Sequence, residues 1–234
     1  AERNPADPVG ETRWLTAYAE GRELPSAIVA QAWLERDDVE AVLTAQASFD
    51  LVRSVRQKPK AAPRAEDFSA AAPGSMADTR FRAGYALLGE LGLSYDLQTP
   101  WWHLGEAADL AGDFPNTQII LNHAGLPSDR SVHGLAGWRD AMRGLAQAPN
   151  VAVKISGIGV PGQAWTVAAN RAIVLDVIEA FGVERCLFAS NFPVDGLCAA
   201  YTEIFDGFKT ITADFSAADR LKLFHDNAVR IYRL

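Results

Sequence analysis

Short apolar runs alternate along the chain with longer segments of helical periodicity, and this alternation restricts the fold more than any other feature. The runs hold four to eight residues, several of them β-branched, which predicts buried strands, and the segments between them predict helices. Successive strands lie at the roughly 30-residue spacing of βα units with parallel strands. The six predicted strands cover residues 26–34, 51–55, 93–98, 117–123, 151–157 and 185–191.

Two architectures cover a parallel sheet with helices: a closed eight-stranded barrel and an open doubly wound sheet. The strand pattern alone leaves both open. No glycine-rich dinucleotide or phosphate loop follows the first predicted strand, which favours the barrel. We expect a single domain over residues 1–234, with a long irregular loop at 57–75 of the kind that forms lids or binding loops. The predicted helices cover 37–49, 76–92, 105–114, 134–148, 166–182, 197–209 and 216–226.

The formal net charge of −7, from 22 Lys and Arg against 29 Asp and Glu, disfavours nucleic acid and anionic membranes as partners. No apolar run approaches the roughly 20 residues that span a bilayer, and the first residues lack a secretory signal pattern. The chain has two cysteines, too few for a disulfide framework. We therefore expect a cytoplasmic protein with a small-molecule ligand.

Ligands of parallel βα folds bind beyond the carboxyl ends of the strands, so polar residues at those ends are the candidates. His123 ends the fourth predicted strand and serves either as a strand cap or as a catalytic metal ligand or carbonyl-polarising donor. Asp195 follows the last strand and is either a helix cap or a general base, since a carboxylate accepts a proton and the amide of Asn191 does not. Asp96 is the other candidate base.

Arg56 lies where the second strand should end, and its guanidinium could hold a substrate carboxylate bidentately, although a solvated basic face is the ordinary alternative. Around the end of the third strand, Asp96, Gln98, Trp102 and His103 combine aromatic faces with polar groups, as small-molecule pockets do. For the tryptophan, core packing is the alternative. No Gly-x-Ser-x-Gly elbow and no zinc-module spacing of Cys and His occurs.

At the ends of three successive predicted strands stand NHAGLP (122–127), KISG (154–157) and SNFPVD (190–195). Together these motifs resemble the amidohydrolase-related family of TIM-barrel hydrolases, and in particular the branch of 2-pyrone-4,6-dicarboxylate lactonase and sugar-lactone hydrolases. SVRQKP (54–59) and DLQTPWWHL (96–104) resemble the same branch. The resemblance implies a (β/α)8 barrel, hydrolysis of a lactone or related carbonyl compound, and a small anionic or lactone-type substrate.

The resemblance also implies roles for single residues. His123 matches the family's histidine at the end of strand six, and Asn191 stands where many relatives have a water-activating Asp. Arg56 matches an anion contact, and Lys154 lies in a characteristic motif in which we expect a substrate contact.

The family opens with a strand that carries a His-x-His pair, and this sequence contains no such pair. We therefore expect the family's first two strands to be absent, so that the (β/α)8 barrel is incomplete at its N-terminus with about six strands visible. Without the pair a divalent ion would lose half of its usual ligands, so we expect no metal. A divalent metal is expected only if the natural protein carries that strand.

Two functions are consistent with these residues. In the first, Arg56 holds a carboxylate, His123 polarises the reacting carbonyl of a lactone or ester, and Asp195 or Asp96 activates water. In the second, the barrel is catalytically inactive and binds a carboxylate or sugar acid, or serves as an interaction subunit. An incomplete barrel exposes two sheet edges, which favours pairing with another copy, so the sequence allows a homo-oligomer.

Overall fold

The computed structural model describes residues 4–234, which form one parallel sheet covered by helices. Each strand is paired with the strand before it in the chain, in the order β1-β2-β3-β4-β5-β6, so β1 and β6 are the outer strands within the described residues. The α/β prediction with about six parallel strands is confirmed. The strands are β1 (Ile28–Gln31), β2 (Val52–Gln57), β3 (Ser94–Leu97), β4 (Ile119–Leu121), β5 (Val151–Ile155) and β6 (Cys186–Phe188).

Helices lie at each of the segments of helical periodicity, and two further helices, α1 at residues 10–19 and α9 at residues 227–232, lie where the sequence predicted no element. The apolar side chains of α1 give a weak pattern because Trp14 and Tyr18 are exposed while Leu15 packs on the core. The helices are α1 (Gly10–Ala19), α2 (Val39–Ala47), α3 (Thr79–Glu90), α4 (Leu104–Asp113), α5 (Val132–Leu145), α6 (Val167–Phe181), α7 (Tyr201–Ile211), α8 (Ala217–Leu221) and α9 (Asn227–Tyr232).

The strands carry different apolar sets on their two faces because side chains alternate along a strand. Tyr95, Leu121 and Val153 belong to the main core under the outer helices. Ile120, Ala152 and Leu187 point the other way and form a second cluster with Ile231 and Tyr232 of α9. We call this second side the inner face of the sheet.

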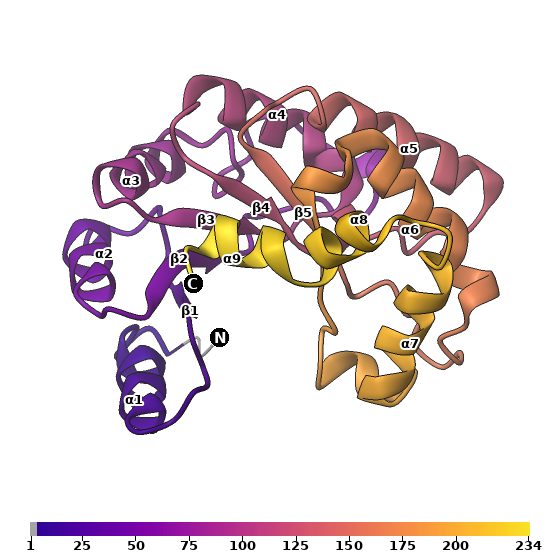
Figure 1. Ribbon diagram of the computed structural model, residues 1–234. Helices are drawn as coiled ribbons and strands as arrows, with labels where there is room; N and C mark the ends of the chain where they lie inside the picture. The colour runs from indigo at the N-terminus through magenta and orange to yellow at the C-terminus, as the bar shows by residue number, and fades with distance from the viewer. Residues whose placement is uncertain (1–3) are drawn as a thin grey trace.

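Helix α9 crosses the inner face, opposite the side that α3 to α6 cover (Figure 1). Its end is held by Arg233, which donates hydrogen bonds to the carbonyl oxygens of Arg53 (3.2 Å) and Gly92 (2.9 Å). Because these two residues lie at the amino ends of β2 and β3, α9 covers the half of the inner face that is remote from the carboxyl ends of those strands.

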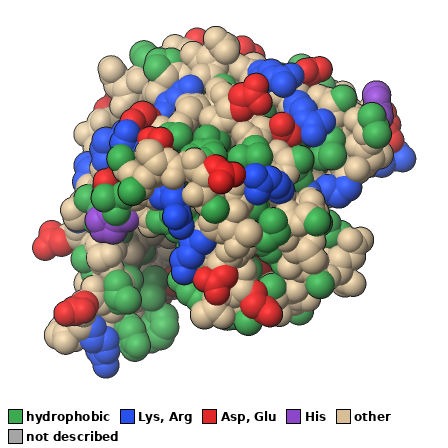
Figure 2. All heavy atoms as spheres, turned by 45° about the vertical axis from the view of Figure 1, so that its right-hand side comes forward, with side chains coloured by type: hydrophobic (Ala, Val, Ile, Leu, Met, Phe, Trp, Pro, Cys, Tyr) green, Lys and Arg blue, Asp and Glu red, His purple; other side chains and the backbone are tan. Residues whose placement is uncertain are grey.

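The surface shown in Figure 2 carries acidic and basic side chains interspersed with apolar ones. Among residues 4–234, every helix is too short or too polar to cross a lipid bilayer. Both cysteines are free thiols, with Cys186 buried and Cys198 half-buried.

Candidate functional site

Three charged side chains meet on the inner face, near the carboxyl ends of their strands. Arg56 on β2 is in register with Asp96 on β3, so both point to the same side of the sheet. Lys154 on β5 also points inward and reaches across β4, which places its Nζ 2.6 Å from Asp96 Oδ1. The sheet therefore brings together residues that are up to 98 positions apart, a consequence of parallel pairing.

The carboxylate of Asp96 is fully engaged. Besides Lys154, the Tyr232 hydroxyl donates to it, at 2.9 Å from Oδ1 and 3.0 Å from Oδ2. Asp96 is only 1% exposed, and burial together with this carboxylate raises the pKa of Tyr232 well above its ordinary value, so the phenol stays protonated. A buried carboxylate with these partners serves as a counter-ion to Lys154, which leaves it poorly placed to take a proton from water.

His123 follows β4 in the short 3-10 segment Asn122–Gly125, so the predicted strand 117–123 ends earlier than expected, at Leu121. The cause is local, because His123 and Ala124 adopt left-handed φ values of 57° and 50° that no strand can contain. Nδ1 of His123 lies 2.9 Å from Ser156 Oγ at the end of β5. Nε2 is therefore the ring nitrogen that a ligand would meet.

Gly157 packs against the imidazole ring of His123. It has a φ of +58°, and a Cβ at this position would lie 2.6 Å from His123 Nδ1. Only a residue without a side chain allows both the backbone conformation and the contact with the ring. The motif KISG thus supplies the serine that orients His123 and the glycine on which it rests.

Burial and the surrounding positive charges keep His123 neutral. Its pKa is lowered to about 4, chiefly by burial and then by the positive charges of Arg56, Lys154 and Lys58, with Asp96 opposing. Arg56 is held in turn by a hydrogen bond from Nη2 to Gln98 Oε1. A neutral imidazole beside three cations forms a site that suits an anionic ligand and a polarised carbonyl oxygen.

Asp195 and Asn191 lie together after β6. Asn191, which has a left-handed φ of 54°, donates from Nδ2 to Asp195 Oδ1 at 2.8 Å. Burial raises the pKa of Asp195, while hydrogen bonds from Asn191 and the backbone of Gly159 oppose the rise. Its other oxygen, Oδ2, is buried and has no hydrogen-bond partner within residues 4–234, so it could accept a proton from a donor that reaches it.

Trp102 and His103 hold the long loop between β2 and α3, which includes the 3-10 turn η1 (Ala65–Asp67). Trp102 Nε1 donates to the carbonyl oxygen of Ala62 (3.0 Å), and the Ala62 N–H donates to His103 Nε2 (2.8 Å). The other ring nitrogen, Nδ1, lies 2.8 Å from Glu106 Oε2. Both side chains use their polar atoms to anchor the loop, a role that the sequence did not reveal.

The structure thus divides the predicted site residues into three groups. His123, Arg56, Asp96 and Lys154 interact electrostatically at the inner face, with Gln98 attached to Arg56. Asn191 and Asp195 form a separate pair after β6, where the backbone of Gly159 also donates to Asp195, and Trp102 and His103 fasten the loop after β2. The sequence missed Tyr232, because no motif links a residue of the last helix to a strand 136 positions earlier.

A cavity of about 550 Å³ lies beside the end of β2 and is lined by residues that include Gln57, Lys58 and Lys60. Among the described residues, no three His, Cys, Asp or Glu side chains lie close enough together to hold a metal ion. Three of the four charged groups that act on His123, Arg56, Lys58 and Lys154, are cations that repel a divalent ion, so the residues present do not fit a metal site.

Comparison with known proteins places the chain among its relatives. It is 43% identical over 231 residues to the uncharacterized protein y4mH of Sinorhizobium fredii, covering 99% of this chain and 77% of that protein. It is 34% identical over 128 residues to an L-fucono-1,5-lactonase of Burkholderia multivorans, covering 50% of this chain and 43% of the lactonase.

Among solved structures, an amidohydrolase of Burkholderia multivorans with bound zinc superposes with a TM-score of 0.83 at 26% identity, covering 96% of this chain and 79% of that one. The family model described as Amidohydrolase matches residues 4–234. The chain therefore belongs to the amidohydrolase family.

Proposed function

We propose that the protein hydrolyses a lactone, or a related cyclic ester, of a small carboxylic or sugar acid. The observation that carries the proposal is the buried, neutral His123 bordered by Arg56, Lys58 and Lys154 at the carboxyl ends of the strands. The similarity of half of the chain to an L-fucono-1,5-lactonase supports the same reaction class. The alternative base Asp96 is disfavoured because Lys154 and Tyr232 already occupy its oxygens.

In this proposal His123 acts as a hydrogen-bond donor. When the Ser156 hydroxyl donates to Nδ1, the ring proton resides on Nε2, which can donate to the carbonyl oxygen of the lactone. With a pKa of about 4 the ring remains neutral at pH 7, so it stabilises the developing oxyanion without losing a proton to it. Arg56 and Lys154 add positive charge that favours an anionic substrate and the tetrahedral intermediate.

Asp195 supplies the base. Its raised pKa makes the carboxylate a stronger proton acceptor, and Asn191 orients it through Oδ1. It takes a proton from water, the hydroxide attacks the carbonyl carbon, and the ring C–O bond breaks. The leaving alkoxide then regains a proton from Asp195, so one lactone and one water yield one hydroxy acid.

The zinc ion of the solved relative has no counterpart in these steps, because the described residues offer no group of metal ligands. The reaction as proposed uses only side chains of this chain. Chelation and metal addition test that choice.

Assays with a panel of five- and six-membered sugar lactones and dicarboxylate lactones test the function. Turnover is measured as the acid that hydrolysis releases into an indicator buffer. We expect turnover of at least one lactone by the wild type, and a loss of about 100-fold or more in His123→Ala. The exposed His225→Ala is the matched control and should keep the wild-type rate. Equal turnover by His123→Ala, folded by circular dichroism, would contradict the role of His123.

Binding without turnover is the second candidate. Asn191 favours it, because an amide stands where many relatives are expected to have the water-activating Asp. Calorimetry against the corresponding hydroxy acids, combined with product detection, separates the two: binding without product supports an inactive receptor, and product excludes it. Pairing with a second copy remains a prediction that light scattering checks.

A further inference from the structure

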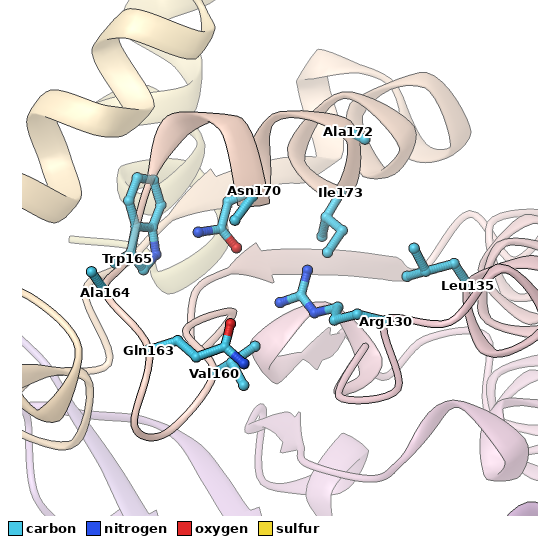
Figure 3. Close-up of a pocket in the computed structure, with 10 residues that line it drawn as sticks. Arg130, Leu135, Val160, Gln163, Ala164, Trp165, Asn170, Ala172 and Ile173 are labelled. Atoms are coloured by element: carbon cyan, nitrogen blue, oxygen red, sulfur yellow. The ribbon is translucent and has the colours of Figure 1, made fainter.

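A second cavity, separate from the residues assigned to catalysis, lies between the loop before α5, the loop after β5 and the first turns of α6 (Figure 3). Its volume is about 270 Å³. None of the proposed catalytic side chains lines it. Its wall combines apolar groups, among them Leu135, Val160 and Ile173, with the polar side chains of Arg130, Gln163, Trp165 and Asn170.

Two donors on this wall lack acceptors. Trp165 is 9% exposed, and its buried indole N–H has no hydrogen-bond partner among residues 4–234. Figure 3 shows that nitrogen turned toward the interior of the cavity. The buried Nε of Arg130 is also without a partner in the described part of the chain. Leaving a buried donor unpaired costs roughly 1–3 kcal/mol, so ligand oxygens that accept hydrogen bonds from these donors would bind favourably.

The electrostatics of the cavity favour a negative ligand. Arg130 donates from Nη2 to the carbonyl oxygen of Ile158 but forms no ion pair with a carboxylate within the described residues. Burial lowers the pKa of Arg130 from its ordinary value, which marks a partly desolvated guanidinium. The side chains of Ala169, Asn170 and Ile173, in the first two turns of the 15-residue helix α6, line the same space and add no charge of their own.

We propose that this cavity binds a small monocarboxylate with a short apolar chain. Its carboxylate accepts hydrogen bonds from Arg130 and, after a small movement of the wall, from the indole of Trp165. The apolar chain packs against Leu135, Val160 and Ile173. Since a cavity of about 150 Å³ accommodates benzene, about 270 Å³ suits an acid with a chain of roughly four to eight carbons.

Calorimetry with butyrate, hexanoate, octanoate and benzoate tests the proposal, with hexanamide as the neutral analogue of hexanoate. We expect at least one acid to bind, and hexanoate to bind at least about tenfold more tightly than hexanamide. This comparison requires no variant and therefore does not depend on folding of a mutant. Equal binding of hexanoate and hexanamide, or no binding heat for any acid up to about 10 mM, overturns the proposal.

Two variants place the site. Arg130→Met should weaken binding of the acid at least about tenfold, whereas Arg143→Met, which removes an exposed guanidinium from α5, should leave it unchanged. Ala169→Leu, which fills the cavity, should weaken binding as well. Equal effects of Arg130→Met and Arg143→Met overturn the proposal.

The same titration in His123→Ala separates this site from the proposed catalytic one. Binding that persists in His123→Ala supports an independent cavity, whatever the outcome of the lactone assay. Binding that disappears in His123→Ala while Arg130→Met retains it assigns the acid to the catalytic site and overturns the proposal.

Discussion

Nδ1 of His123, just beyond β4, lies 2.9 Å from Oγ of Ser156, at the end of β5. This contact fixes the orientation of the ring. When the Ser156 hydroxyl donates its proton to Nδ1, it also fixes the ring proton on Nε2. Ser156→Ala should therefore lower kcat by about tenfold, the usual effect of removing a partner that orients a functional histidine, with a smaller change in KM. Steady-state kinetics with the lactone found active checks this. The exposed Ser48→Ala should match the wild type, and an unchanged kcat in Ser156→Ala would contradict the orienting role.

Gly157→Ala should damage the site through one added carbon atom. The left-handed φ of +58° costs about 1–2 kcal/mol with a Cβ, and the new atom would also overlap the imidazole of His123. Gly92→Ala carries the same kind of backbone cost, at φ +65°, with nothing within 4 Å of its Cβ. In urea unfolding, we expect both variants to lose stability because of the strained backbone, and Gly157→Ala to lose at least as much as Gly92→Ala. Only Gly157→Ala should lose turnover. Full activity of Gly157→Ala would contradict the contact.

The stability of the fold should fall on mild acidification because of His123. Its pKa is about 4 in the folded protein against an ordinary value of 6.5, so below pH 6.5 the unfolded chain binds a proton that the folded chain rejects. The stabilising contribution, up to about 3 kcal/mol, is fully present above pH 6.5 and is lost as the pH falls toward 4. Urea unfolding at pH 7, 6 and 5 measures the slope. His123→Gln should show a shallower slope, and an equal slope would refute the assignment.

Breaking the pair of Lys154 and Asp96 should destabilise the fold more than removing the phenol beside it. Lys154→Met leaves a buried carboxylate uncompensated and should cost about 3 kcal/mol or more. Tyr232→Phe removes one donor and should cost about 1–2 kcal/mol. Asp96→Asn combined with Lys154→Met should recover part of the loss. Denaturant titrations of the three variants measure these free energies of unfolding. An equal cost for Lys154→Met and Tyr232→Phe would contradict the expected order.

Chelation should leave the lactone reaction unaffected. The described residues hold no group of three metal-ligating side chains, and the positive charges next to His123 disfavour a divalent ion. Protein treated with EDTA and protein supplied with zinc should therefore turn over substrate at the same rate. Loss of activity on chelation with recovery on zinc addition would require a different mechanism.

Much of the sheet could be predicted from the sequence because most of the strands are short apolar runs that parallel pairing buries on both faces. The residues at which the strands end were harder to predict. TQIILNH contains no sign that His123 leaves the strand, since neither His123 nor Ala124 is a residue type that favours the left-handed φ it adopts. Helix α1 escaped prediction because its exposed Trp14 and Tyr18 obscure the buried side.

The candidate site was predictable only where a motif placed a polar residue at a strand end. His123 and Lys154 fall in this class. The pairing of Asp96 with Tyr232 joins residues 136 positions apart, and no local pattern encodes such a contact. The residue types of Trp102 and His103 suggested contacts with a ligand. In the structure, the polar atoms of both side chains form hydrogen bonds with the backbone of Ala62. Residue type and strand position together indicate a site, and only the tertiary contacts show which atoms remain available.

The counter-ion arrangement on the inner face has an evolutionary consequence. A carboxylate with 1% exposure is tolerated only with its donors, so positions 96, 154 and 232 should be inherited as a set. In a family alignment, homologues in which the lysine has drifted to an apolar residue should also have exchanged the aspartate for a neutral one. The last helix would then covary with two strands that lie far from it in the sequence.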